Sequence, residues 1–326
     1  MSTLESVALA DVFGEGRAPM TRTEAMSVPA VAKARHLVTG LGRQPLCAYE
    51  GATRLPSPQW MVRTDSETPP QTRMSWTLDD LFFGGWSLWW RENAPDGSLA
   101  DAVRVPPELW DFDVDGRVHV EGAPAPADRV VLFSGPYEGL LEAGVRTIRA
   151  ARNLEEAWAK RVQSPIPLVV IKQTVSDDEL GEVQIDPETG EEIDEGQEVV
   201  RAYVDARRDP NGAAAFAPYG YDLEAKGDVR HELFVEGRNA VTLDVGRFAN
   251  IPGTLLDASM STASLTYSTT EGKRSDYLDM SAAFWLGPIE ARLSMDDVMP
   301  AGQRAAFDLS NLTVVPATGT APATED

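Results

Sequence analysis

The chain has 326 residues, of which 43% are apolar and 25% charged, as is typical of a globular protein able to bury a sizeable core in one or two domains. The 51 acidic residues outnumber the 29 basic ones and give a formal net charge of -22, which repels nucleic-acid phosphates and disfavours a general or sequence-specific DNA binder. No apolar run reaches the roughly 20 residues of a membrane span, and the N-terminus lacks the basic start of a signal peptide. We therefore expect synthesis in a cytoplasm and no membrane partner.

The first elements are predicted from caps and periodicity. Residues 1–22 are expected to form a mobile arm. Ser27 as cap and Pro29 in the first turn predict the start of a helix. Its apolar face comprises Val31, Ala34, Leu37, Val38 and Leu41. Glycines weaken the end of this helix, and an extended segment follows at 45–51, where Cys47 is expected to be buried.

A β region is predicted next. Thr77 is interpreted as the cap of a short helix, with Asp79 and Asp80 in its first turn. Alternating or β-prone runs then predict a small mixed β region, at 86–92, 102–106, 109–114, 117–122 and 129–135. The tryptophans of this region are typical of a packed sheet, and a platform for stacking sugars or bases is the alternative.

A long amphipathic helix is predicted over 137–163. Its stripe comprises Leu141, Val145, Ile148, Ala151, Leu154, Trp158 and Val162. Its outward residues include Arg146, Arg149, Arg152, Glu155 and Glu156. Prolines end the helix, and a strand is expected over 167–174.

An acidic stretch at 177–198 contains 11 acids and no lysine or arginine. Pro187 and Gly190 predict a hairpin turn within it. A solvated acidic loop is the interpretation favoured over a metal site, since no histidine or fixed ligand spacing accompanies the acids. A second helix is predicted over 195–208 and an irregular or extended stretch over 213–227.

The segment 238–257 is the most informative of the chain. Phe234, Gly237, Val241, Val245 and Phe248 mark one face of a helix that should end near residue 250. The reason is that the residue before a proline, here at position 252, is pushed toward extended geometry. Gly253 permits a turn before an apolar pair at 255–256 returns to a core. Residues 273–296 are expected to be helical with an interruption at Pro288, and the Pro/Thr/Ala-rich tail to be disordered.

Motifs for reaction chemistry are weak. Asp111–Gly122 has the oxygen spacing of a calcium loop, but its twelfth position is Gly122 where a bidentate glutamate is needed. A strand–turn–strand hairpin explains this segment better. The three histidines, at 36, 119 and 231, lie in separate segments, and no nucleophile elbow, phosphate loop or dinucleotide fingerprint is present. We therefore predict no catalytic residue, no metal and no cofactor.

Five stretches in order resemble the portal proteins of tailed bacteriophages, especially the compact portals of actinobacterial siphophages. They are residues 30–51, 78–93, 135–161, 236–257 and 264–294. The last two are the most specific, with the motif residues Arg238, Asn239, Pro252, Gly253, Pro288 and Glu290. A departure is the segment SPIPLVVI after the long helix, and little sequence follows Leu312 for a large C-terminal crown.

The resemblance implies an α+β portal fold with a mixed β wing region, long helices and a small clip. The implied segments are a mobile arm at 1–22, a wing at 23–135, a stem and clip at 136–226, a helix with the Ile-Pro-Gly break and a closing helical region at 227–312, and a disordered tail at 313–326.

The resemblance also implies a twelve-subunit ring at one capsid vertex of the virion. This ring would conduct double-stranded DNA without sequence-specific binding, and would contact the terminase, the head–tail adaptor and the major capsid protein. Acidic walls suit this role, since like charge keeps a sliding duplex from adhering. Ring closure needs two different faces per subunit. Candidate halves of these contacts are Arg146, Arg149 and Arg152 on one side and Asp177, Asp178, Glu179, Glu191 and Glu192 on the other, and solvated charged faces are the alternative.

Other functions are also compatible with the sequence. One is another head–tail connector or capsid-associated protein. A second is a carbohydrate-active or metal-dependent enzyme that uses the tryptophan-rich sheet with Asp113, Asp115 and Glu121. A third is a DNA-binding protein, which the net charge disfavours.

Overall fold

The structure is a computed structural model. It describes residues 19–64, 67–163, 168–174, 200–201, 221–226, 232–256 and 277–313. The chain divides into two compact units, Met1–Glu155 with Val235–Asp326, and Glu156–Phe234. The first unit therefore takes sequence from both ends of the chain.

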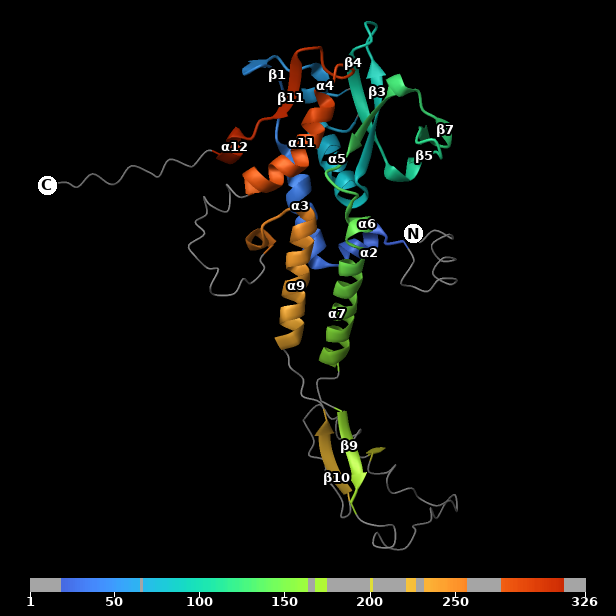
Figure 1. Cartoon of the computed structure of the whole chain (residues 1–326), viewed down its shortest axis with the longest axis vertical. Helices are drawn as coiled ribbons and strands as arrows, with labels where there is room; N and C mark the ends of the chain where they lie inside the picture. The colour runs from blue at the N-terminus through green and yellow to red at the C-terminus, as the bar shows by residue number, and fades with distance from the viewer. Residues whose placement is uncertain are drawn as a thin grey trace, which may run out of the picture. The chain divides into compact units, whose positions relative to one another are not determined.

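The larger unit begins with helices that pack along one another (Figure 1). The short α2 (Arg22–Met26) is closed by a capping box in which Thr21 and Glu24 exchange hydrogen bonds. It leads into α3 (Pro29–Gly40), the 3₁₀ turn η2 (Leu41–Arg43), α4 (Gln59–Val62) and α5 (Pro70–Gly84). Gly42 lets η2 approach α5 closely, since a Cβ there would lie 2.6 Å from the backbone nitrogen of Ser75. The predicted apolar face of α3 is confirmed, since Val31, Ala34 and Val38 are buried and Leu37 is partly buried; Leu41 is buried in η2.

Among the described residues of this unit there are three small antiparallel sheets. One has the order β11–β1–β2, from β1 (Leu46–Glu50), β2 (Thr53–Leu55) and β11 (Gln303–Phe307). The second has the order β4–β3–β8, from β3 (Trp86–Asn93), β4 (Leu99–Val105) and β8 (Val130–Ser134). The third joins β5 (Trp110–Phe112), β6 (Val118–Val120) and β7 (Ala123–Pro124). Short 3₁₀ turns, η3 (Pro107–Leu109) and η4 (Ala127–Arg129), precede β5 and β8.

The β region predicted between 86 and 135 is thus confirmed, but its described strand pairs are all antiparallel and not mixed. Of the tryptophan cluster, Trp60 and Trp89 are buried in the packed core, whereas Trp76 and Trp86 are exposed. Trp89 is fully buried, lies 4.7 Å from Phe133 between ring centroids, and donates its indole N–H to Thr77 at 2.7 Å. A buried tryptophan usually finds such a partner for its indole N–H.

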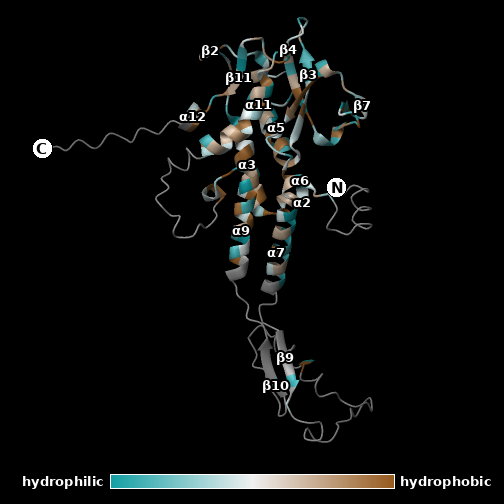
Figure 2. Ribbon diagram, viewed as in Figure 1, coloured by the Kyte–Doolittle hydropathy of each residue, from teal (hydrophilic) through white to brown (hydrophobic). Residues whose placement is uncertain are grey.

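Helices α6 (Leu140–Ala143), α7 (Val145–Gln163) and α9 (Glu232–Ala249) continue the chain, and the unit boundary falls within α7 and α9. Figure 1 shows α7 and α9 side by side, and Figure 2 shows hydrophobic and hydrophilic residues interspersed along both. Ile148 and Ala151 of the predicted stripe are buried, whereas Trp158 is exposed. The single helix predicted over 137–163 is wrong at its start, because Gly144 separates α6 from α7.

The chain after α9 closes the unit. The 3₁₀ turn η6 (Gly253–Leu256) is followed by the π-helix η8 (Tyr277–Ala282), α11 (Ala283–Leu293) and α12 (Ser310–Thr313). Trp285 of α11 is fully buried against Phe82 and Tyr137, and donates its indole N–H to the carbonyl of Ala249 at 2.8 Å. The core therefore joins α5, α9 and α11, which are far apart in sequence.

Three predicted boundaries are corrected. Ser27 ends α2, and α3 begins after Val28 without a side-chain cap. Thr77 lies inside α5, which starts at Pro70, and its hydroxyl bonds the carbonyl of Arg73 at 2.9 Å. Pro288 does not interrupt α11, although its ring nitrogen offers no hydrogen to the carbonyl four residues earlier. Burial of Trp285 and Ile289 on either side of this proline holds the helix together.

The smaller unit has one described antiparallel pair of strands, β9 (Leu168–Gln173) and β10 (Tyr221–Lys226). Their register runs from Leu168 opposite Lys226 to Gln173 opposite Tyr221. The strand predicted over 167–174 is confirmed, and the irregular stretch at 213–227 contains a second strand. The predicted acidic hairpin and all of the second helix except residues 200–201 lie outside the described residues, as do residues 1–18 of the predicted arm and the tail from 314. The last residues of that arm, Thr21 and Arg22, belong to the capped α2.

Candidate functional site

The row of arginines on α7 is the first part of the predicted contact surface. Arg152 forms an ion pair within its own chain, with its guanidinium 2.8 Å from the carboxylate of Glu24. The backbone N–H of Thr21, acting with Arg152, lowers the pKa of Glu24. Arg149 is half-buried, and Arg146 is exposed. Arg146 is therefore the member of this row that a neighbouring subunit can reach most readily.

The acidic half of the predicted subunit contact consists of five carboxylates between residues 177 and 192. Asp177, Asp178, Glu179, Glu191 and Glu192 all lie outside the described residues. Their pairing with the α7 arginines stays a prediction.

The motif residues of α9 hold that helix against α7. Arg238 lies 3.8 Å from Glu155, and Gly237 allows close packing, since a Cβ there would lie 3.0 Å from the side chain of Leu154. Asn239 is half-buried on the next position of α9. Close packing at Gly237 and an ion pair at the next position, Arg238, therefore help to join the two helices.

The end of α9 is a Schellman motif. The N–H of Ile251 bonds the carbonyl of Gly246 at 2.8 Å, and the N–H of Asn250 bonds the carbonyl of Arg247 at 3.4 Å. Asn250 has a φ of 51°, the left-handed conformation that this motif requires. Pro252 then accepts the first hydrogen bond of η6, from Leu255 at 2.9 Å, and Leu256 is buried. The predicted helix end, turn and return to the core are confirmed.

Asn250 also joins the end of α9 to the π-helix η8 by two hydrogen bonds. Its side-chain amide donates to the carbonyl of Met280 at 3.0 Å, while its own carbonyl accepts from the hydroxyl of Ser281 at 2.7 Å. Sequence reasoning missed this residue. Its signal was an asparagine between a helix and an Ile-Pro-Gly sequence, since asparagine tolerates the left-handed conformation.

Glu290 fastens α11 to β11. One carboxylate oxygen accepts the backbone N–H of Phe307 at 2.7 Å, and burial raises the pKa of this carboxyl. The hydroxyl of Ser294, one turn further along α11, accepts the N–H of Ala305 at 3.0 Å. Glu290 is therefore a residue that joins a helix to a sheet edge, and Pro288 lies in the helix that carries it.

Two buried aspartates on α5 form ion pairs with arginines from other parts of the chain. Asp79 lies between Arg22 and Arg35, with 2.7 Å to the latter. Asp80 pairs with Arg104 and accepts the hydroxyl of Ser87 at 2.7 Å. Burial raises the pKa of Asp80, although its two partners oppose the shift. Local sequence patterns predicted both aspartates in the first turn of a helix. No local pattern indicates that their arginine partners lie 24 to 57 residues away.

The hairpin predicted at 111–122 is confirmed. Asp111 pairs with His119 across β5 and β6, and the turn is closed by the N–H of Gly116 on the carbonyl of Asp113 at 3.0 Å. The carboxylate of Asp113 accepts the N–H groups of Asp115 and Arg117, which lower its pKa. Within the described residues, no group of three His, Cys, Asp or Glu side chains could hold a metal ion. Cys47 is buried, as predicted.

Among the described helices, none has both the length and the apolar character needed to cross a membrane. The site residues described here join helices and strands to one another, and they include ion pairs, caps and hydrogen bonds to backbone. Such contacts define a scaffold with charged outer faces.

Comparison with family models and with curated proteins finds no match for this chain. Solved structures do match. A phage portal protein of the HK97 family from Corynebacterium diphtheriae has a TM-score of 0.70 and 28% identity, covering 92% of this chain and 99% of that one. A chain from the neck of an empty gene transfer agent particle, computed with C6 symmetry, has a TM-score of 0.61 and 14% identity over 94% of this chain and 85% of its own.

A chain from the neck of the native gene transfer agent particle, computed with C12 symmetry, has a TM-score of 0.60 and 13% identity, covering 94% of this chain and 85% of that one. The particle chains show the shared fold alone. The HK97-family structure adds sequence identity over almost its entire length. The chain therefore has the fold of phage portal proteins, and both the predicted resemblance to them and the predicted α+β portal fold are confirmed.

Proposed function

We propose that copies of this chain close into a ring at one capsid vertex and that double-stranded DNA passes through its centre during packaging and ejection. The observation that carries the proposal is the fold shared with an HK97-family portal protein over 92% of this chain and 99% of that one. The net charge of -22 supports a channel that surrounds DNA without adhering to it.

Twelve subunits are proposed for the ring in the virion. The neck of the native gene transfer agent particle was computed with C12 symmetry, and its chain shares this fold. A closed ring needs head-to-tail contacts between two different faces of each subunit. The exposed Arg146 is proposed to lie in one of these faces, and the acids between 177 and 198 to contribute to the other.

The proposed partners are the terminase, the head–tail adaptor and the major capsid protein. Residues 23–135 would form the wing, 136–226 the stem and clip, and 227–312 the helix with the Ile-Pro-Gly break and the closing helical region. The antiparallel sheets at 86–134 support a wing, and the long helix α7, which packs against α9 of the following segment, supports a stem. We propose no catalytic role and no cofactor for this chain.

Particle images and particle masses test the proposal. The purified full-length chain should give rings with a central hole in negative stain, and mass photometry should show a species of many subunits. A protein that stays monomeric both alone and within assembled virions would overturn the ring. Filled discs or fibres without a central hole would instead indicate another connector protein.

A further inference from the structure

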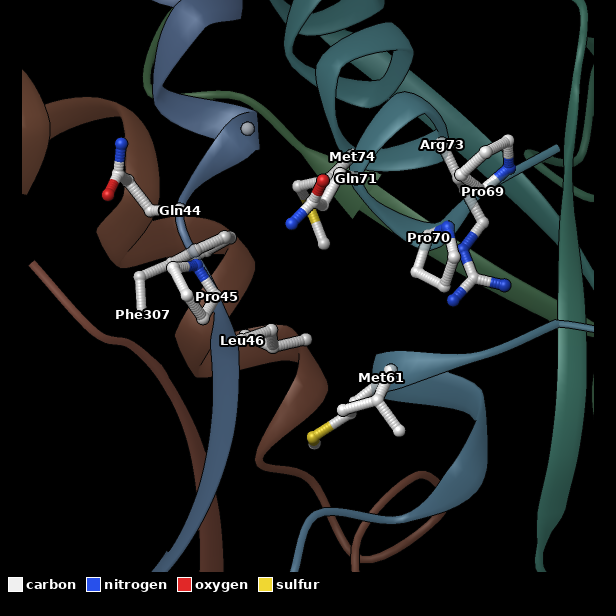
Figure 3. A pocket seen from close by; sticks show the side chains of 12 residues that line it. Gln44, Pro45, Leu46, Met61, Pro69, Pro70, Gln71, Arg73, Met74 and Phe307 are labelled. Carbon is white, nitrogen blue, oxygen red and sulfur yellow. The ribbon is translucent and has the colours of Figure 1, made fainter.

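A pocket of about 270 Å³ opens beside the start of α5 in the larger unit (Figure 3). Its walls come from η2, β1, α4, α5 and β11. The lining is mostly apolar and includes Pro45, Leu46, Met61, Val62, Pro70, Met74 and Phe307. A concave apolar surface of this kind, with few polar groups, is the usual form of a binding site.

Arg73 is the charged residue of this lining. Its side chain is 3% exposed, stacks at 4.6 Å over the ring of Trp89, and donates to Asp101 at 3.2 Å and to the carbonyls of Trp60 and Ala102. These bonds use both terminal nitrogens. The remaining Nε finds no acceptor among the described residues. Since buried donors are nearly always paired in folded proteins, Nε points to an acceptor supplied from elsewhere.

The rim of the pocket is apolar and locally basic. Val62 is 65% exposed at its edge. In the sequence, exposed Arg43 and Arg63 directly adjoin lining residues. The half-buried Asp308, which is paired with Arg54, also adjoins one, and the exposed acid Glu67 lies two residues before Pro69. In a chain with a net charge of -22, this rim favours an acidic occupant.

We propose that this pocket holds the apolar stretch Val7–Phe13 of the same copy of the chain, and that a main-chain carbonyl oxygen of this stretch accepts the Nε–H of Arg73. The sequence of residues 7–13 is VALADVF, with four large apolar side chains and one acid. Residues 1–18 as a whole carry three acids and one arginine, the charge balance that the basic rim favours.

The length of the N-terminal segment is sufficient. The described chain starts at residue 19, and Arg22 is bonded to Asp79 in the second half of α5. The pocket lies at the first turn of the same helix, about 13 Å along its axis at 1.5 Å per residue. The span between Phe13 and Pro19 reaches about 20 Å when extended, and that between Val7 and Pro19 about 40 Å. The stretch can therefore reach the pocket of its own copy.

The same copy is favoured over a second one, because a tethered segment has an effective concentration in the millimolar range. The C-terminal tail is the other segment within reach, since it follows Phe307 by only a few residues. Its large apolar residues are confined to Val314 and Val315, and it has no aromatic side chain to fill the pocket.

Disulfide trapping in the full-length chain tests this proposal. The pair Phe13→Cys with Val62→Cys should form a disulfide within one chain at least ten times faster than the control pair Phe13→Cys with Val114→Cys, because Val114 is fully exposed on the β5–β6 turn. Equal rates would overturn the proposal. So would a predominance of disulfides between chains, which would assign the pocket to a second copy, or faster trapping of Val315→Cys with Val62→Cys. The native Cys47 is buried and does not compete.

Hydrogen exchange supplies a second readout. Phe13→Asp should speed amide exchange at Met61 and in the first turn of α5, whereas the matched variant Ser2→Asp should leave it unchanged. Identical exchange in the two variants would contradict docking. The trapping within one chain is measured on dilute monomer, so failure of the proposed ring does not alter the outcome.

Discussion

The carboxylate of Glu290 accepts the backbone N–H of Phe307 at 2.7 Å, and this bond ties α11 to the strand that pairs with β1. Residue 307 lies directly opposite Leu46 in that pair, so the bond helps to hold the C-terminal stretch of the larger unit against its N-terminal stretch. Burial of Glu290 raises the pKa of its carboxyl above the ordinary value of 4.5.

A raised pKa means that the folded state binds the proton of Glu290 more tightly than the unfolded state does. Its stabilising contribution is therefore full below pH 4.5 and is lost as the pH rises through the higher folded pKa. We expect Glu290→Gln, which keeps an acceptor for the N–H of Phe307, to be as stable as the parent at pH 4 and more stable at pH 8. Thermal melts across this range measure the difference.

The truncation Glu290→Ala is the matched control for that experiment. It removes the acceptor and leaves the N–H of Phe307 unpaired, which costs about 1–3 kcal/mol. Loss of stability at every pH is the expected result. A Glu290→Gln variant that is as destabilised as Glu290→Ala at pH 8 would contradict the assigned pKa direction.

The ion pair between Asp80 and Arg104 should be far more important than exposed pairs. The Asp80 side chain is 3% exposed and that of Arg104 16%. Asp80→Ala leaves a largely buried guanidinium without its partner, and we expect a loss of about 3–5 kcal/mol in chemical denaturation. Asp244→Ala breaks the exposed pair with Arg247 and should change stability by less than about 0.5 kcal/mol. Equal losses of stability in the two variants would contradict the prediction that the buried ion pair contributes more than the exposed one.

Gly139 is expected to tolerate no side chain. Its φ is 94°, and a Cβ would lie 2.5 Å from the carbonyl oxygen of Phe83. Gly139→Ala combines backbone strain with a clash against backbone, whereas Gly97→Ala, at a φ of 84° in open space, adds the strain alone. We predict that Gly97→Ala costs about 1 kcal/mol and Gly139→Ala several times more. Denaturant midpoints compare them, and similar midpoints would refute the close approach at Gly139.

The proposed ring contact gives a prediction about assembly. Arg146→Glu should reduce ring formation without lowering the melting temperature of the subunit, because this exposed arginine is proposed to face a neighbouring subunit. Arg117→Glu, on the exposed β5–β6 turn, is the charge-matched control and should assemble normally. Mass photometry counts the rings. Normal assembly of Arg146→Glu would remove this residue from the contact.

The sequence by itself determined those features that depend on residues close together in the chain, such as strands, helix faces and helix ends. The alternation at 86–92 predicted β3, and the burial pattern of α3 followed from its apolar spacing. The end of α9 followed from Pro252, whose ring restricts the residue before it. The order of such segments was also enough to reveal the resemblance to portal proteins, since each segment keeps its own local pattern.

Only the tertiary structure decided which distant groups meet. Thr77 and the aspartates beside it read as a helix start, because serine, threonine and aspartate favour that position in isolation. In the fold all three lie inside α5. The indole of Trp89 bonds Thr77 there, Arg22 and Arg35 pair with Asp79, and Arg104 pairs with Asp80. Likewise Pro288 predicts a break from local rules, and burial of the residues around it preserves α11. Local propensities amount to a few tenths of a kcal/mol to about 3 kcal/mol per residue, and packing across the core outweighs them.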